Sequence, residues 1–231
     1  MDLFLMLLRW LHFMFGITWI GLLYYFNFVQ TPFFAETDPT VRSGAVQKLV
    51  PRALWWFRWG AMGTVIVGLT YLIIRWAQLG ESFVPSPYGV AILTGGTLGI
   101  IMFLNVWLVI WPNQQIVIAS AVAVAGGAQA NPAAAGAGRR AGLASRTNTL
   151  FSIPMLFFMG AASHYPLFTD VTSNGIMLWI VLSGVIIAAV EVNALVGTQG
   201  ATKKPLDSIA GVIHAGLGLT IVLALIISFL V

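Results

Sequence analysis

The chain alternates between long apolar stretches and shorter polar links, a pattern typical of a bundle of membrane-spanning helices. The first stretch, residues 9–29, contains no Lys, Asp or Glu and carries its single Arg at the start. A helix needs about 20 predominantly apolar residues to cross roughly 30 Å of hydrocarbon. Six stretches match this requirement, at about residues 9–29, 55–76, 89–111, 149–168, 173–196 and 208–231. The predicted fold is therefore all-α, with residues 1–231 forming one integral membrane domain of six transmembrane helices.

Two of the polar links have features of their own. Residues 30–52 contain a short helical pattern at 41–50, which we expect to lie along the membrane surface. Residues 113–148 form the longest link, and its middle, 126–142, consists mainly of Ala and Gly. Because so few side chains there can be buried, we expect this segment to be mobile or held by a partner. Pro112, just before this link, is expected to end or kink the third span.

The composition excludes a soluble domain and several kinds of redox centre. Hydrophobic residues make up 59% of the chain and charged residues 8%, whereas about 25% of the residues in a soluble domain are charged. The sequence contains no cysteine. A disulfide, a thiolate metal site, an iron–sulfur cluster and covalently attached c-type haem are therefore excluded within it.

The basic residues predict the orientation of the chain in the membrane, because cytoplasmic loops carry an excess of Lys and Arg. In a six-span arrangement, Arg9 and Arg75 fall on one side and the other nine basic residues fall on the opposite side. The nine are Arg42, Lys48, Arg52, Arg58, Arg139, Arg140, Arg146, Lys203 and Lys204. That side is predicted to face the cytoplasm, so both termini are predicted to face outward. The pI near 9.8 then reflects topology, and the expected partner is the lipid bilayer, with no nucleic acid.

Two histidines are candidates for a site near the outer surface. His12 lies near the outer end of the first predicted span and His164 near the outer end of the fourth, so we expect both at one depth. Haem iron can take an imidazole on each face, and histidine is the natural ligand in a chain without cysteine. One hypothesis is a b-type haem whose iron is held by His12 and His164. The alternative is that both histidines lie at headgroup depth and bond to neighbouring groups.

Four further polar residues fall near the inner ends of their spans, namely Arg58, Asn105, Glu191 and His214. Glu191 with Arg58 or His214 is the candidate pair in this inner polar cluster. A functional interpretation is a proton path, or a site for a small anion at Arg58. The alternative is a structural ion pair with hydrogen bonds that hold the helices together. The pattern assigns no catalytic residue.

Four segments together resemble the membrane domain of the bacterial membrane-bound, cytochrome-c-linked urate oxidase (urate hydroxylase) family. They are residues 9–21 (RWLHFMFGITWIG), 56–59 (WFRW), 105–115 (NVWLVIWPNQQ) and 163–168 (SHYPLF). The segments are spread over four of the six spans in the order of the family. The chain departs from the family in three respects: it has no CxxCH motif, it has six predicted spans instead of about eight, and Gly60 stands where the family tends to have an acidic residue.

The resemblance implies an oxidoreductase of the bacterial inner membrane, in which the outward-facing termini lie in the periplasm. It would pass electrons to a periplasmic c-type cytochrome supplied by another protein, with a urate-like purine as substrate. Two other hypotheses stay open. The few charges, the glycine-rich helix faces and the short loops are also typical of a non-catalytic accessory or scaffold subunit of a larger membrane complex. A small-solute transporter that uses Arg58 and Glu191 is the third hypothesis, and the absence of a visible inverted repeat in the sequence counts against it.

Overall fold

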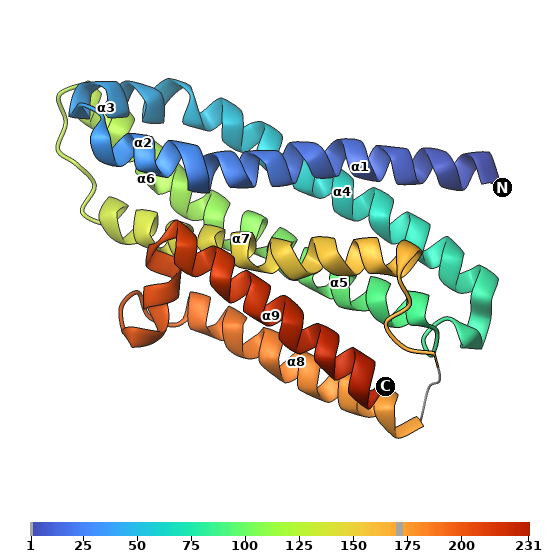
Figure 1. Ribbon diagram of the computed structural model, residues 1–231. Helices are drawn as coiled ribbons and strands as arrows, with labels where there is room; N and C mark the ends of the chain where they lie inside the picture. The colour runs from blue at the N-terminus through green and yellow to red at the C-terminus, as the bar shows by residue number, and fades with distance from the viewer. Residues whose placement is uncertain (1, 170–172) are drawn as a thin grey trace. The chain divides into compact units, whose positions relative to one another are not determined.

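The computed structural model describes residues 2–169 and 173–231, and every regular element in this part of the chain is a helix (Figure 1). The predicted all-α class is thus confirmed. Met1 and residues 170–172 of the predicted domain lie outside the described residues. The chain divides into two units: Met1–Gly68 with Phe103–Asn148, and Leu69–Met102 with Thr149–Val231.

The elements of the first unit come from both halves of the chain. They are α1 (Asp2–Tyr24), the π-helical turn η1 (Tyr25–Gln30), α2 (Thr31–Glu36), α3 (Pro39–Lys48), the larger part of α4 (Val50–Leu79), the π-helical turn η3 (Asn105–Ile110), α6 (Trp111–Ala125) and the start of α7 (Ala134–His164). The second unit holds the remainder of α4 and α7, η2 (Gly80–Ser82), most of α5 (Pro87–Leu104), α8 (Ser173–Leu195), η4 (Ala201–Asp207) and α9 (Ile209–Leu230).

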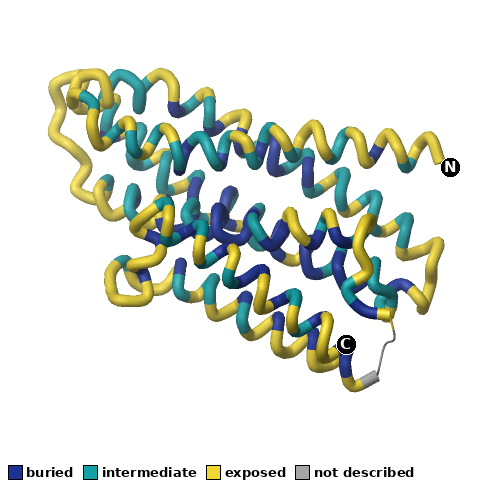
Figure 2. The backbone as a smooth tube through the Cα atoms, in the orientation of Figure 1, coloured by how far each residue is buried: buried dark blue, intermediate teal, exposed yellow. Residues whose placement is uncertain are grey.

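Five helical stretches among the described residues are long and apolar enough to cross a membrane, namely Asp2–Glu36, Val50–Ser82, Pro87–Ala125, Asn174–Leu195 and Ile209–Leu230. Exposed residues run along the helices of both units (Figure 2). Large apolar residues are among them, including Ile17, Leu108 and Ile221. Both features agree with an integral membrane protein. The predicted span at 149–168 falls largely in α7, which is not among the five. The count of six spans and the periplasmic position of the termini therefore stay predictions.

The third span does not end at Pro112, contrary to that part of our expectation. The helix continues as α6 to Ala125 because a π-helical turn, η3, immediately precedes the proline. In this turn the Trp111 N–H bonds to the carbonyl of Val106, five residues back instead of four. A wider turn relieves the clash that a proline ring otherwise makes with the preceding turn. The same arrangement, η1 followed by α2, carries the first long helix past Pro32.

The Ala- and Gly-rich segment is helical from residue 134 onward, so the expectation of a mobile link is wrong for residues 134–142. The alternative, that a partner holds the segment, stays a prediction. The connection is limited to residues 126–133, and α7 begins at residue 134. Ala137, Ala141 and Ala144 are buried and follow a spacing of four and three residues, which places them on one face of α7. Alanine has the highest helix propensity, and a face of small residues allows the neighbouring backbone to approach closely. The packing of these small side chains thus stabilises the helix, although the segment contains few large apolar residues.

The structure also bears on the short helix expected in the link 30–52 and on the arginines of the link 113–148. The short helix expected at residues 41–50 is confirmed as α3, which packs against α6. Its position along the membrane surface stays a prediction. The helix α7 contains the three arginines of the predicted link 113–148, namely Arg139, Arg140 and Arg146.

Close contacts at glycine define the packing of the second unit. The helices α8 and α9 lie side by side there (Figure 1). Gly216 of α9 faces α7, where a Cβ atom on this residue would lie 2.9 Å from the carbonyl oxygen of Leu150. The same atom would lie 3.2 Å from the Cβ of Ile153. Only a residue without a side chain fits this contact, whereas a Cβ on Gly218 would meet nothing within 4 Å among the described residues.

The replacement Gly216→Val is therefore expected to destabilise the protein, while Gly218→Val serves as its matched control. Overpacking of this kind costs about 1–3 kcal/mol. Both variants share the cost of a β-branched residue in a helix, so that the difference between them isolates the contact. Thermal unfolding in detergent should give a lower midpoint for Gly216→Val, and equal midpoints for the two variants would contradict the packing of α9 on α7.

Candidate functional site

His12 lies on α1 and is anchored to the backbone of α4. Its Nδ1 lies 2.9 Å from the carbonyl oxygen of Thr64. A carbonyl can only accept a hydrogen bond, so Nδ1 carries the proton. In the neutral imidazole the lone pair is then on Nε2, and the neutral form is favoured because a charge within a membrane span is costly. The contact thus fixes both the ring and its tautomer.

Small residues on α4 allow this contact to form. Gly60, Thr64 and Gly68 follow one another at intervals of four residues and so lie on one face of the helix. A Cβ atom on Gly68 would lie 2.8 Å from Cε1 and 2.9 Å from Nδ1 of His12, and one on Gly60 would lie 3.1 Å from the backbone nitrogen of Trp19. The absence of side chains at these positions brings α1 and α4 together, as is common in membrane helix pairs.

The structure also explains why Gly60 replaces the acidic residue of the family pattern. Gly60 is buried, and its Cα faces the backbone of α1. A Cβ atom there would lie 3.3 Å from Cγ2 of Thr18 and 3.4 Å from the carbonyl oxygen of Phe15. An acidic residue at this position would require these neighbours to move by a few tenths of an ångström.

Arg58, two residues before Gly60 on α4, is surrounded by tryptophan rings. The guanidinium carbon lies 3.9 Å from the ring centroid of Trp111, 5.0 Å from that of Trp107 and 6.0 Å from that of Trp59. Trp59 and Trp107 also meet edge to face, with their centroids 5.6 Å apart. These cation–π contacts join the segments 56–59 and 105–115, which are distant in the sequence. Among the described residues of the first unit, Arg58 makes no hydrogen bond and no ion pair.

Buried amides form a third feature of the first unit. Asn105, in the π-helical turn η3, donates through Nδ2 to Oδ1 of Asn148 on α7 at 2.9 Å. Asn27, in the other π-helical turn, donates through Nδ2 to Oγ of Ser145 at 2.8 Å and to the carbonyl of Leu23 at 2.9 Å. Both asparagines and Asn148 are buried. Each π-helical turn thus presents an amide to α7, which carries polar groups that a membrane helix must pair internally.

The predicted site residues are divided between the two units. His12, Arg58 and Asn105 belong to the first unit, and His164, Glu191 and His214 belong to the second. The pairing of His12 with His164, and of Glu191 with Arg58 or His214, stays a prediction.

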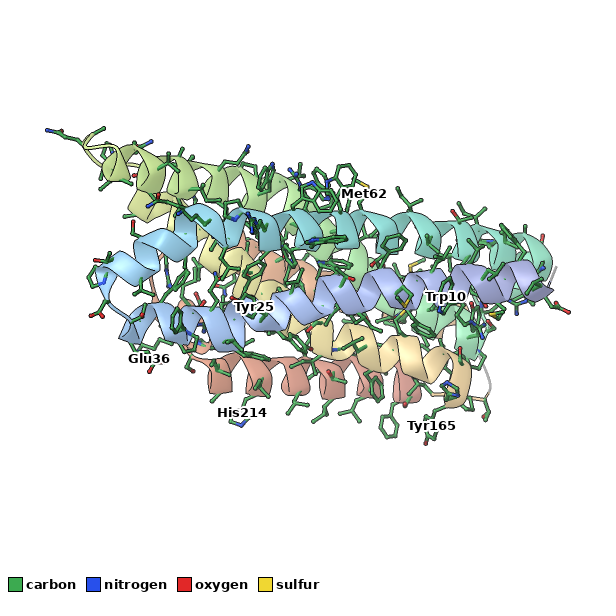
Figure 3. The ribbon with its side chains drawn as sticks, turned by 90° about the horizontal axis from the view of Figure 1, so that it is seen from above. Trp10, Tyr25, Glu36, Met62, Tyr165 and His214 are labelled. Atoms are coloured by element: carbon green, nitrogen blue, oxygen red, sulfur yellow. The ribbon has the colours of Figure 1, made fainter. Side chains whose placement is uncertain are left out.

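The residues of the second unit differ in exposure. His164 and His214 are exposed, whereas Glu191 is half-buried. The imidazole of His214 projects away from α9 (Figure 3). Among the described residues, no group of three or more His, Asp or Glu side chains could hold a metal ion. A porphyrin iron requires only one or two protein ligands.

Several residues of these sites were missed from the sequence. The spacing of Gly60, Thr64 and Gly68 was a readable signal for a helix contact on α4. The partners of the amides, Ser145 and Asn148, had no such signal. They lie in α7, but the sequence pattern predicted residues 113–148 to be a polar link.

Comparison with known proteins identifies the family. The model of the family described as urate oxidase N-terminal matches residues 77–227, nearly two thirds of the chain. The chain belongs to the urate oxidase N-terminal family. Two of its motif segments, 105–115 and 163–168, lie within the match, whereas 9–21 and 56–59 precede it. No curated protein and no solved structure matches the chain.

The amide contact in this urate oxidase N-terminal chain can be measured with a double-mutant cycle. We expect Asn105→Ala to lower the free energy of unfolding by about 1–3 kcal/mol, because a buried amide loses a partner. The coupling between Asn105→Ala and Asn148→Ala should be about 0.6–1.7 kcal/mol, the range found between membrane helices. Asn113→Ala with Asn148→Ala is the control, since Asn113 bonds to Val109 and Arg140. A coupling for the first pair no larger than that of the control would refute the contact.

Proposed function

We propose that the protein is a redox component of the bacterial inner membrane that holds a b-type haem through Nε2 of His12. The observation that carries this proposal is the hydrogen bond from Nδ1 of His12 to the carbonyl of Thr64 at 2.9 Å. Metal-ligating histidines usually donate their second ring nitrogen to a carbonyl or carboxylate, which fixes the tautomer and raises the basicity of the ligand. When bound, the haem would supply one-electron transfer.

Exposed aromatic residues flank His12 in the sequence of α1. Trp10 and Phe13, which neighbour it on α1, are exposed large aromatic residues. Aromatic side chains can cover a porphyrin and keep water from it. Gly68 and the Thr64 carbonyl hold the imidazole from the side of α4, so that the ring has a fixed orientation before any ligand binds. The protein's own contribution is thus a preset, neutral nitrogen ligand within the membrane.

On the basis of the sequence, His164 is the candidate for a second residue that would hold the haem. It is the last residue of α7, and among the described residues it makes no hydrogen bond that would orient its ring. An unanchored histidine can turn toward a ligand, but it offers less support than His12. Its contribution therefore has to be tested separately.

Membership in the urate oxidase N-terminal family supports an oxidoreductase. On this proposal the electrons pass to a periplasmic c-type cytochrome, and a urate-like purine is the candidate substrate. Arg58, Asn105, Glu191 and His214 have no assigned part in the redox step.

The test is a reduced-minus-oxidised absorption spectrum with an iron determination on the purified protein. We expect about one iron per chain and a b-type haem band. His12→Ala should abolish the band, because the anchored ligand is removed, and Gly68→Leu should weaken it by displacing the ring. His214→Ala is the control and should retain the full band.

The outcomes separate the parts of the proposal. If neither protein nor membranes show a haem band, the redox function is refuted. If His12→Ala retains the band of the unmodified protein, the assignment of the ligand is wrong. If His164→Ala changes the band from a six-coordinate to a five-coordinate spectrum, the second ligand is confirmed, and an unchanged spectrum excludes it.

A further inference from the structure

Arg58 is a cation that lacks a counterion within its own unit. Its guanidinium carbon lies within 6.0 Å of the three tryptophan ring centroids described above, and its Nε is buried without a hydrogen-bond acceptor among the described residues. The guanidinium carbon lies over these rings. A tryptophan ring carries no net negative charge, so these cation–π contacts supply no counterion and no oxygen acceptor to the guanidinium N–H groups.

The charge of the first unit cannot neutralise this cation. The unit contains eight basic residues and three acidic ones, a balance of +5, whereas the second unit has three basic and four acidic residues. The three acidic residues are Asp2 at the start of α1, and Glu36 and Asp38 between α1 and α3. Seven of the eight basic residues lie in two short segments, 42–58 and 139–146. The unit therefore presents a local excess of positive charge.

The depth of Arg58 indicates where its partner comes from. Arg58 and Arg75 are 17 residues apart on α4, about 26 Å along the axis at about 1.5 Å per residue. This distance is close to the roughly 30 Å of a hydrocarbon core, so the two arginines can lie near its opposite boundaries. Trp55, Trp56 and Trp59 are exposed around Arg58, and exposed tryptophans mark the headgroup level of membrane proteins.

We propose that Arg58 and its tryptophan cage bind the headgroup phosphate of an anionic phospholipid. A guanidinium offers parallel N–H donors that match two phosphate oxygens, and the rings of Trp107 and Trp111 hold its plane in place. Clusters of basic residues beside membrane helices attract anionic lipids. The neighbouring basic residues of α3 and the start of α4 supply this attraction. The lipid then neutralises the arginine, and binding secures the contact between the segments 56–59 and 105–115.

The test compares lipid binding by Arg58→Gln and by the matched control Arg75→Gln. Arg75 lies on the same helix, but its guanidinium already donates to Oε1 of Gln78 at 2.8 Å. Native mass spectrometry of the purified full chain would measure the binding of added cardiolipin and phosphatidylglycerol. We expect binding to Arg58→Gln to be about tenfold weaker, the effect of losing a hydrogen bond to a charged group, and binding to Arg75→Gln to be unchanged.

Further measurements identify the source of the phosphate and guard against misfolding. Phosphatidylcholine and inorganic phosphate are expected to bind the unmodified protein at least tenfold more weakly than cardiolipin. If Arg58→Gln does not fold, Arg58→Lys replaces it and should bind cardiolipin several-fold more weakly, because lysine retains the charge but not the planar fork. Equal binding by the unmodified protein and the Arg58 variant would overturn the proposal. It would also be overturned if inorganic phosphate bound to the unmodified protein as tightly as cardiolipin does.

This lipid site is independent of the proposed redox function. The haem band of Arg58→Gln should equal that of the unmodified protein, since Arg58 is not one of the proposed haem ligands. Loss of lipid binding with the haem band intact supports the lipid site alone, whereas loss of both together would overturn a specific role for Arg58 in lipid binding.

Discussion

The first unit depends on the close approach of α1 to α4, where an imidazole N–H meets a backbone carbonyl. The hydrogen bond from His12 to Thr64 can form because Gly60 and Gly68 have no side chains that would separate the helices. In lipid, such packing replaces the hydrophobic effect as the source of helix association. One contact therefore both joins the two helices and orients the ring that we propose as a haem ligand.

The same need to satisfy polar groups explains the other features of this unit. The π-helical turns carry the chain past Pro32 and Pro112 while helices α2 and α6 continue, and each turn places an asparagine opposite α7. The polar residues Ser145 and Asn148 of α7 are accommodated because Asn27 and Asn105 of the same unit form hydrogen bonds with them. Arg58 is the exception, since its unit supplies aromatic rings but no anion. The redox chemistry that we propose at His12 and the lipid binding that we propose at Arg58 are thus separate uses of one packed unit.

Hydropathy was sufficient to predict the helical class and the five stretches that are long and apolar enough to cross a membrane, and it placed His12 inside the first of them. The sixth predicted span, 149–168, is not among the five. Periodicity also predicted α3. The link at 126–142 could not be predicted correctly because the rule applied to it, that few large side chains mean little order, ignores the packing of small residues such as Ala137 and Ala141. Pro112 was misjudged because the π-helical turn before it has no known sequence signal of its own.

The site was predictable only in part, for a physical reason. A histidine in a span can be recognised as unusual from its cost in lipid, but its acceptor is a main-chain carbonyl, which every residue has. No residue type in the sequence could therefore identify Thr64 as the partner. The tryptophan cage had a signal in the aromatic residues of segments 56–59 and 105–115, although their contact across 50 positions follows only from the fold. The family resemblance identified both segments without indicating that they meet.

The tautomer of His12 tests the central claim most directly. Nitrogen-15 NMR of the ring nitrogens can be measured on haem-free protein, with His164 and His214 replaced by Gln so that one histidine gives the signal. The account predicts a protonated Nδ1 and an unprotonated Nε2 at neutral pH, because Nδ1 must donate to the carbonyl of Thr64. A ring protonated at Nε2 and bare at Nδ1 would contradict it.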